Sequence, residues 1–158
     1  MTELKFAPRD IFEKILEYAV IPTFDLVIEL PRGGVVVVFR KIKPYADTWA
    51  LPGLRMMKPE SIEDTLTRIA RQEVGLEIDT KERVFLGQFV GRFRTEMNRQ
   101  DLSTGYFVRA MDNDIKINTD HFSRCKVIFH RADIPKRMGA MYKYYLHTYF
   151  DLKEGGKL

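Results

Sequence analysis

Residues 49–76 read WALPGLRMMKPESIEDTLTRIARQEVGL, and the middle of this stretch is predicted to be a helix between two loops. Ser61 and Asp64 have the spacing of a capping box, in which each side chain accepts a hydrogen bond from the other residue's backbone N–H at the start of a helix. Gly75 suits the left-handed conformation that ends many helices. Glu73 lies on an otherwise apolar stripe of this helix, so its carboxylate is a candidate for a specific role.

Helices separate two groups of strands along the rest of the chain. The predicted elements are, in order, a helix at 8–18, strands at 23–30, 35–40 and 49–51, a helix from 61 to 75, strands at 83–93, 104–111 and 126–130, and a helix at 132–150. Residues 31–34, Pro-Arg-Gly-Gly, are a turn that makes a hairpin of the first two strands, and the charged stretch 94–103 is predicted to be a loop. This order predicts a mixed α/β fold, with helices on both faces of a mixed sheet, formed by a single domain over residues 1–158.

Composition limits the class of protein. The chain has 158 residues, 45% of them hydrophobic and 30% charged, which is typical of a globular domain. The longest apolar run, residues 35–39, is too short to span a bilayer, no signal peptide is recognisable, and the single Cys125 excludes an intrachain disulfide. We therefore expect a cytoplasmic protein with no membrane partner. The net charge of +4 is spread along the sequence without a basic block, so we also expect no nucleic-acid partner.

The stretch 49–76 resembles the Nudix box, Gly-x5-Glu-x7-Arg-Glu-U-x-Glu-Glu-x-Gly-U, in which U is aliphatic. The positions that agree with it are Glu60, Arg68, Ala70, Glu73, Gly75 and Leu76, after the usual lead-in residues Trp49, Leu51, Pro52 and Gly53. Leu54 replaces the first motif glycine, and Ile69 and Gln72 replace two of the glutamates. The resemblance implies the Nudix fold, an α/β/α sandwich with a mixed β-sheet, and a hydrolase that acts on diphosphates.

The lost glutamates change which metal site this helix could form. Diphosphates bind through hard divalent cations, which take oxygen ligands. Side chains at positions i and i+4 of a helix, such as Ile69 and Glu73, share one face. Because only Glu73 remains on the second half of the helix, the residues disfavour a site for several ions and leave a site for one Mg2+, with Mn2+ as the alternative.

The GDP-mannose mannosyl hydrolase branch of the family departs from the box at the same two glutamates, and the chain resembles this branch from Pro22 to Leu76 without a gap. The residues that this resemblance assigns to catalysis and substrate binding are Asp25, Arg40, Arg55, Arg68 and Tyr106, with His121 as the general base. The implied metal ligands are Gly53, through its carbonyl, Glu73 and Asp120. Glu60, at the start of the helix, is expected to support the structure of the site.

The resemblance implies that water attacks the anomeric carbon of GDP-mannose or a similar nucleotide sugar, so that GDP leaves and the sugar is inverted. His121 would take the proton from water, since imidazole exchanges protons near neutral pH. The implied partner is a small-molecule nucleotide sugar, and apolar residues on the terminal helices, together with the family, predict a homodimer. Two alternatives stay open: a diphosphatase that cleaves between the phosphates, with Glu96 and Asp101 as substitute carboxylates, and a non-catalytic nucleotide-sugar-binding module.

Replacing Arg55 or Arg68 by Gln tests this assignment. Each change removes a positive charge that would stabilise the leaving diphosphate, so we expect turnover of the nucleotide sugar to fall much more than the free energy of unfolding. Steady-state kinetics and urea denaturation of each variant measure the two effects. Near-normal turnover in both variants would contradict the assignment.

Overall fold

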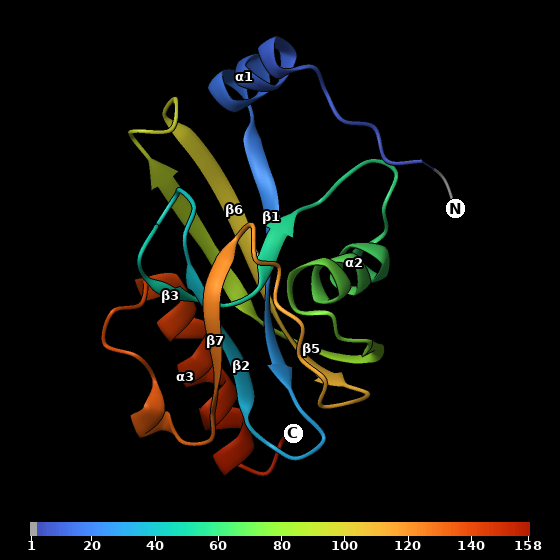
Figure 1. The fold of residues 1–158 in the computed structure, drawn as a ribbon, viewed down its shortest axis with the longest axis vertical. Coiled ribbons are helices and arrows are strands. Elements are labelled where there is room, and N and C mark those ends of the chain that lie inside the picture. The colour runs from blue at the N-terminus through green and yellow to red at the C-terminus, as the bar shows by residue number, and fades with distance from the viewer. Residues whose placement is uncertain (1–2) are drawn as a thin grey trace.

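The structure is a computed structural model that describes residues 3–158 (Figure 1). Its elements are, in order, α1 (Arg9–Tyr18), β1 (Val20–Glu29), β2 (Val35–Arg40), β3 (Trp49–Ala50), β4 (Gly53–Arg55), α2 (Ile62–Val74), β5 (Ile78–Phe93), β6 (Arg99–Ala110), β7 (Phe122–Ile128), a 3-10 turn (Arg131–Asp133) and α3 (Ala140–Glu154). The predicted order of helices and strands is confirmed, and β4 is an addition to it. No helix within the described residues is long and apolar enough to cross a lipid bilayer.

The strands form one sheet of mixed direction. Its strand order is β3-β2-β1-β6-β5, with β4 beside β1 and β7 beside β2. β1 runs parallel to β6 over ten residue pairs, whereas the other neighbouring strands are antiparallel. The predicted mixed sheet is therefore confirmed, and its one parallel pair lies in the middle of it.

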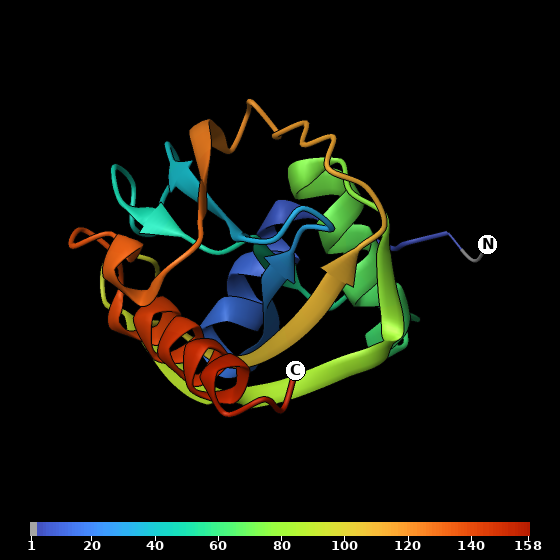
Figure 2. The same cartoon turned by 90° about the horizontal axis from the view of Figure 1, so that it is seen from below.

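The helices α2 and α3 cover opposite faces of the sheet (Figure 2). Successive side chains of a strand point to opposite faces. On β6, Phe107 stacks on Tyr149 of α3, with ring centroids 5.5 Å apart. The preceding residue, Tyr106, lies under Arg83, which pairs with Glu63 of α2 at 2.8 Å. This arrangement confirms the predicted sandwich of helices around a mixed sheet.

The strands β1 and β2 separate soon after their connecting turn. They pair at Glu29 and Val35, and β1 then pairs with β4, so that Asp25 lies opposite Gly53. β2 pairs instead with β3 and β7. The predicted hairpin is therefore confirmed only at its turn, because β4 takes the edge of β1 that a full hairpin would use. The four valines of β2 are fully buried, at 0% exposure, as predicted for a strand covered on both faces.

The capping signals of α2 are confirmed. The Ser61 side chain accepts a hydrogen bond from the Asp64 backbone N–H at 3.1 Å, and Asp64 accepts one from the Ser61 N–H at 2.9 Å. Gly75 ends the helix with φ at 67°. These local contacts fix where the helix begins and ends, and they leave Glu73 facing inward with only 1% of its surface exposed.

Several predicted boundaries were wrong. β1, β5 and β7 begin at Val20, Ile78 and Phe122, a few residues before the predicted starts at 23, 83 and 126. Two further differences are larger or change the site. β6 begins at Arg99, so residues 99–103 are strand rather than loop, and Met97 and Asn98 make the turn before it with positive φ values of 57° and 55°. Charged and polar side chains on one face of this segment concealed its strand character. The last helix begins at Ala140 rather than 132, because Pro135 disfavours a helical conformation in the residue before it.

Helix α1 buries none of its residues fully. It leaves apolar side chains exposed, with Ile11 at 47%, Ile15 at 38% and Tyr18 at 82% of their surfaces. Such residues were the reason to expect a homodimer, which stays a prediction.

Replacing Ser61 by Ala removes half of the capping box and leaves the backbone N–H of Asp64 without its partner. We expect the free energy of unfolding to fall by about 1 kcal/mol. Urea denaturation measures the change. Ser123→Ala is the control, because Ser123 is exposed on β7 and makes no side-chain hydrogen bond to any residue in 3–158. Equal stability of the two variants would show that the box adds nothing.

Candidate active site

A cleft of about 340 Å³ lies where β1 and β2 separate. Its walls come from α1, α2, α3, β1, β2, β4, β5 and β6, together with the loop after β2 and the turn before β7. The predicted site residues that line it are Asp25, Arg40, Gly53, Arg55, Glu73 and His121. Side chains from distant parts of the sequence thus face one concave space, as a small-molecule site requires.

Positive charge is concentrated in the cleft by three arginines, Arg40, Arg55 and Arg99. Arg40 Nε donates to the carbonyl of Pro44 at 2.8 Å, which fixes the base of its guanidinium. Burial, followed by the charges of Arg99 and Arg68, lowers the pKa of Arg55. Because these like charges repel one another, an anionic ligand between them would be stabilised.

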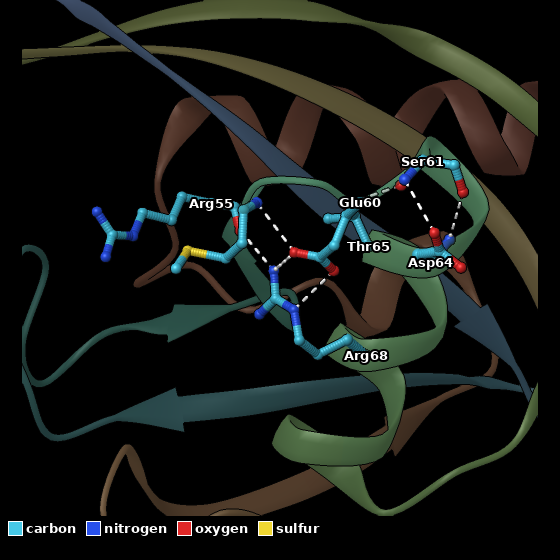
Figure 3. A network of polar contacts seen from close by, with 7 residues as sticks. Arg55, Glu60, Ser61, Asp64, Thr65 and Arg68 are labelled. Atoms are coloured by element: carbon cyan, nitrogen blue, oxygen red, sulfur yellow. Dashed lines mark hydrogen bonds and ion pairs between the residues drawn. The ribbon is translucent and has the colours of Figure 1, made fainter. Parts of the chain in front are cut away.

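Glu60 and Arg68 form a bidentate ion pair next to the backbone of Arg55 (Figure 3). Arg68 donates from Nε and Nη2 to the two carboxylate oxygens of Glu60 at 2.8 and 2.9 Å. Glu60 also accepts from the backbone N–H of Met57 at 2.9 Å, and Arg68 Nη2 donates to the Arg55 carbonyl at 2.7 Å. The Arg55 side chain points away from the pair (Figure 3). The pair therefore fixes the backbone from which Arg55 extends.

Arg68 and Glu60 do not line the cleft. Their contacts support a positioning role for both, and direct catalysis by Arg68 stays a prediction. Removing the Arg68 guanidinium would leave the Glu60 carboxylate unpaired, although only 6% of that side chain is exposed. The structure thus adds a stability cost to Arg68→Gln that Arg55→Gln does not share.

Glu73 and His121 form a second acid–base pair, which faces the cleft. His121 Nδ1 lies 2.7 Å from Glu73 Oε1, and the side-chain amide of Asn118 donates to the same oxygen at 3.4 Å. Burial raises the pKa of Glu73, and the charge of His121 opposes this. A buried carboxylate that holds one ring nitrogen of a histidine is the arrangement that orients a general base.

The donors in the cleft fit one metal ion rather than several. Glu73 Oε2 makes no hydrogen bond to any residue in 3–158, and Gly53 lines the same cleft. No cluster of three or more His, Cys, Asp or Glu side chains suited to a metal occurs within that range. One carboxylate and one carbonyl suit a Mg2+ that keeps water and substrate oxygens as its other ligands.

Asp25 is a buried carboxyl in the floor of the cleft, with 5% of its surface exposed. Ser103 Oγ donates to Asp25 Oδ2 at 2.5 Å and lies 2.9 Å from the Tyr145 hydroxyl. Burial raises the pKa of Asp25 to about 7, while the Ser103 hydrogen bond and the charge of Arg40 oppose the rise. A Cβ at Gly53 would lie 2.1 Å from Asp25 Oδ1, so only glycine leaves room for this carboxyl.

Tyr106 and Asp120, which were predicted as site residues, do not line the cleft. Tyr106 points to the α2 face of the sheet, where its ring stacks on Phe24 at 6.0 Å. Asp120 is exposed in the turn before β7, and its backbone N–H donates to Asn118. Their roles stay predictions that the geometry of the cleft does not support.

Three residues of β6 line the cleft: Arg99, Asp101 and Ser103. The sequence had suggested Asp101 only as a substitute carboxylate of a diphosphatase, and it had not indicated Arg99 or Ser103 as site residues. Arg99 Nε lies 2.6 Å from Asp101 Oδ1. Their spacing of two residues is the signal of a shared strand face, and it would have identified them if the segment had been recognised as a strand.

An aromatic wall, formed by Tyr45 and Phe93, stands beside these charges. The ring centroids are 5.4 Å apart, with planes at 71°. Tyr45 has a positive φ of 63°, which costs a residue other than glycine about 1–2 kcal/mol. The carbonyl of the preceding residue, Pro44, holds Arg40. The same loop therefore positions the aromatic ring of Tyr45 and the guanidinium of Arg40.

The raised pKa of Asp25 predicts a pH dependence of stability. The ordinary pKa is 3.8 and that of the folded protein is about 7, so between these values the folded state keeps a proton that the unfolded state has released. The contribution of this group to stability is complete below the lower value and is lost as pH rises through the upper one. The loss amounts to roughly 1.4 kcal/mol per pH unit within the window.

Urea denaturation of the wild type and Asp25→Asn at about pH 5 and pH 6.5, in EDTA, isolates this group, because an Asn can still accept the hydrogen bond from Ser103. We expect the wild type to lose about 2 kcal/mol relative to the variant across this interval. A difference that stays constant with pH would disprove the raised pKa.

Comparison with known proteins identifies the family. The NUDIX domain family matches residues 20–149. A relative, the low-salt glycan biosynthesis protein Agl8 of Haloferax volcanii, is 31% identical over 125 residues, which cover 76% of this chain and 78% of Agl8. The MutT NUDIX hydrolase from Burkholderia pseudomallei has a similar structure, with a TM-score of 0.70 at 18% identity, covering 81% of this chain and 96% of the other. The NUDIX domain of Shewanella oneidensis NrtR, complexed with ADP ribose, gives 0.68 at 17% identity, covering 92% of each chain. The chain belongs to the NUDIX domain family.

Proposed function

We propose that this protein is a Mg2+-dependent hydrolase of nucleotide-diphospho-sugars, with GDP-mannose as the first substrate to test. It would add water at the anomeric carbon and release the nucleoside diphosphate and the free sugar. The Glu73–His121 pair supports this proposal most directly, because it faces the same cleft as Arg40 and Arg55. A candidate general base and candidate phosphate-binding cations thus share one space.

His121 is the proposed base. Its Nδ1 is held by Glu73, so Nε2 remains to take a proton from the attacking water, and the carboxylate then stabilises the imidazolium that forms. The bond from the water oxygen to the anomeric carbon forms as the carbon–oxygen bond to the diphosphate breaks. The electron pair of the broken bond stays on the leaving diphosphate oxygen.

Arg40 and Arg55 are the proposed stabilisers of that leaving group. Negative charge builds on the diphosphate as the bond breaks, and guanidinium groups meet it with charge-assisted hydrogen bonds. When held by Glu73 Oε2 and the Gly53 carbonyl, Mg2+ would supply further positive charge to the same oxygens.

The walls of the cleft also agree with a nucleotide sugar as ligand. Tyr45 and Phe93 offer aromatic ring faces of the kind on which a nucleobase stacks. Asp101 and Ser103 present polar groups that suit sugar hydroxyls. The name of the Agl8 relative, a glycan biosynthesis protein, points to sugar chemistry as well.

A diphosphatase that cleaves between the phosphates is the second candidate. Its support is Asp101, because this carboxylate lines the cleft and could replace one of the lost glutamates. Glu96, the other substitute that the sequence suggested, lies in the turn before β6 and does not line the cleft. Ile69 is fully buried in the core and supplies no ligand. The third alternative is a binding module, and the NrtR NUDIX domain solved with ADP ribose shows a similar fold holding such a ligand.

Product analysis separates these candidates. The protein is incubated with Mg2+ and a panel of nucleotide sugars, GDP-mannose first, and the products are separated by ion exchange. We expect GDP and free hexose. GMP and hexose phosphate would replace the proposal by the diphosphatase. Ligand binding without any product would replace it by the binding module.

A variant pair tests the base. His121→Asn removes the proton acceptor, and we expect kcat to fall by roughly 100- to 10,000-fold. His147→Asn is the matched control, because His147 is exposed on α3 and does not line the cleft. Unchanged kcat in His121→Asn would rule out this residue as the base.

A further inference from the structure

Tyr142, in the first turn of α3, presents an unpaired hydroxyl to the cleft. The residue lines the cleft, although only 5% of its surface is exposed. Its hydroxyl makes no hydrogen bond to any residue in 3–158. Within those residues, no fully buried side-chain nitrogen or oxygen lacks a partner, so the Tyr142 hydroxyl must be reachable from the cleft.

The other buried tyrosines of α3 behave differently. The Tyr145 hydroxyl bonds to Ser103, and the Tyr149 hydroxyl donates to Glu29 at 2.5 Å. A buried hydroxyl without a partner is unfavourable, which explains why these two are paired. Tyr142 is equally buried as a residue, yet its polar atom is left for a ligand.

Two carboxylates line the same cleft as this hydroxyl, those of Asp25 and Asp101. Burial is the largest cause that raises the pKa of Tyr142, the charges of Asp25, Tyr45 and Asp101 add to it, and the charge of Arg40 opposes it. Each aspartate uses one oxygen within the protein, Asp25 Oδ2 for Ser103 and Asp101 Oδ1 for Arg99. The second oxygen of each makes no hydrogen bond to a residue of the described chain.

The chemistry of these three groups selects the ligand. Carboxylate oxygens accept hydrogen bonds, and a phenol both donates and accepts. A ligand that carries several neutral hydroxyls satisfies all three, whereas ionised phosphate oxygens only accept hydrogen bonds and would leave the free carboxylate oxygens without a donor. The phosphate-binding arginines and this group therefore suit different halves of one substrate.

We propose that Tyr142 is a specificity-determining residue whose hydroxyl binds a sugar hydroxyl, and that with Asp25 and Asp101 it forms the sugar subsite of the cleft. This inference rests on the proposed function in taking a nucleotide sugar as the ligand. It does not depend on which bond of that ligand is cleaved.

Tyr142→Phe tests the inference, because it keeps the buried ring and removes only the oxygen. Binding is measured by equilibrium dialysis in EDTA, where turnover is prevented. The probes are GDP-mannose, GDP-glucose, UDP-glucose and ADP-glucose, each compared with its own nucleoside diphosphate. For the sugar nucleotide that the wild type binds best, we expect Kd to rise by about 3- to 10-fold in the variant, with Kd for the diphosphate unchanged. Tyr144→Phe, on the exposed side of α3, is the control and should change neither value.

The possible results separate the inference from the proposed function. An equal rise in Kd for both ligands would place Tyr142 at the phosphates, and no rise for either would leave it a packing residue, so each would overturn the inference. If the expected shift is found but no nucleoside diphosphate and free sugar form in Mg2+, the sugar subsite stands and the proposed hydrolysis fails.

Discussion

The parallel pairing of β1 with β6 sets the two faces of this protein. In paired parallel strands, opposite residues point to the same face, so ten consecutive pairs divide both strands between α2 and α3. Asp25 and Ser103 therefore meet on the α3 face, where Tyr145 joins them. Tyr106 belongs to the other set, and no rotation of its side chain can bring it through the sheet. The polar floor of the cleft follows from this single register.

The pairs Glu60–Arg68 and Glu73–His121 show that a carboxylate held by a basic side chain can have either a structural role or a free oxygen that faces the cleft. Glu60 has both oxygens occupied by Arg68, and one of them by a backbone N–H as well, so it has little left to offer a ligand. Glu73 uses one oxygen for His121 and keeps the other. The first pair stabilises the backbone around Arg55, whereas the second keeps one carboxylate oxygen free in the cleft, where it could hold a metal ion. The two carboxylates differ less in burial than in how many of their oxygens already accept hydrogen bonds within the protein.

Local signals could be predicted from the sequence, and long-range ones could not. The ends of α2 depend on Ser61, Asp64 and Gly75 through contacts within a few residues, so they were predicted correctly. The start of β6 was missed because Arg99 and Asp101 face a polar cleft, and the apolar alternation that signals a strand is absent there. The parallel partner of β1 is β6, which lies far along the chain, so no short turn in the sequence indicates that the two strands pair.

Tyr142 could not be identified for a related reason. In the sequence it is one of several tyrosines in an amphipathic pattern, and it is indistinguishable from Tyr145 until the cleft and the hydrogen bonds of its neighbours are known. It differs from Tyr145 because its hydroxyl makes no hydrogen bond to any of the described residues.

The close fit between Gly53 and Asp25 has an evolutionary consequence. Since a Cβ at position 53 would collide with the carboxyl at 25, and would lie 2.8 Å from the backbone oxygen of Phe24, position 53 cannot change freely while Asp25 is present. A lineage that gains any side chain at 53 must shorten residue 25 and shift the backbone of β1, and it loses the buried acid in doing so. The two sites should therefore covary as one inherited unit, and a homologue with a larger residue at 53 should have abandoned the carboxylate in the floor of the cleft.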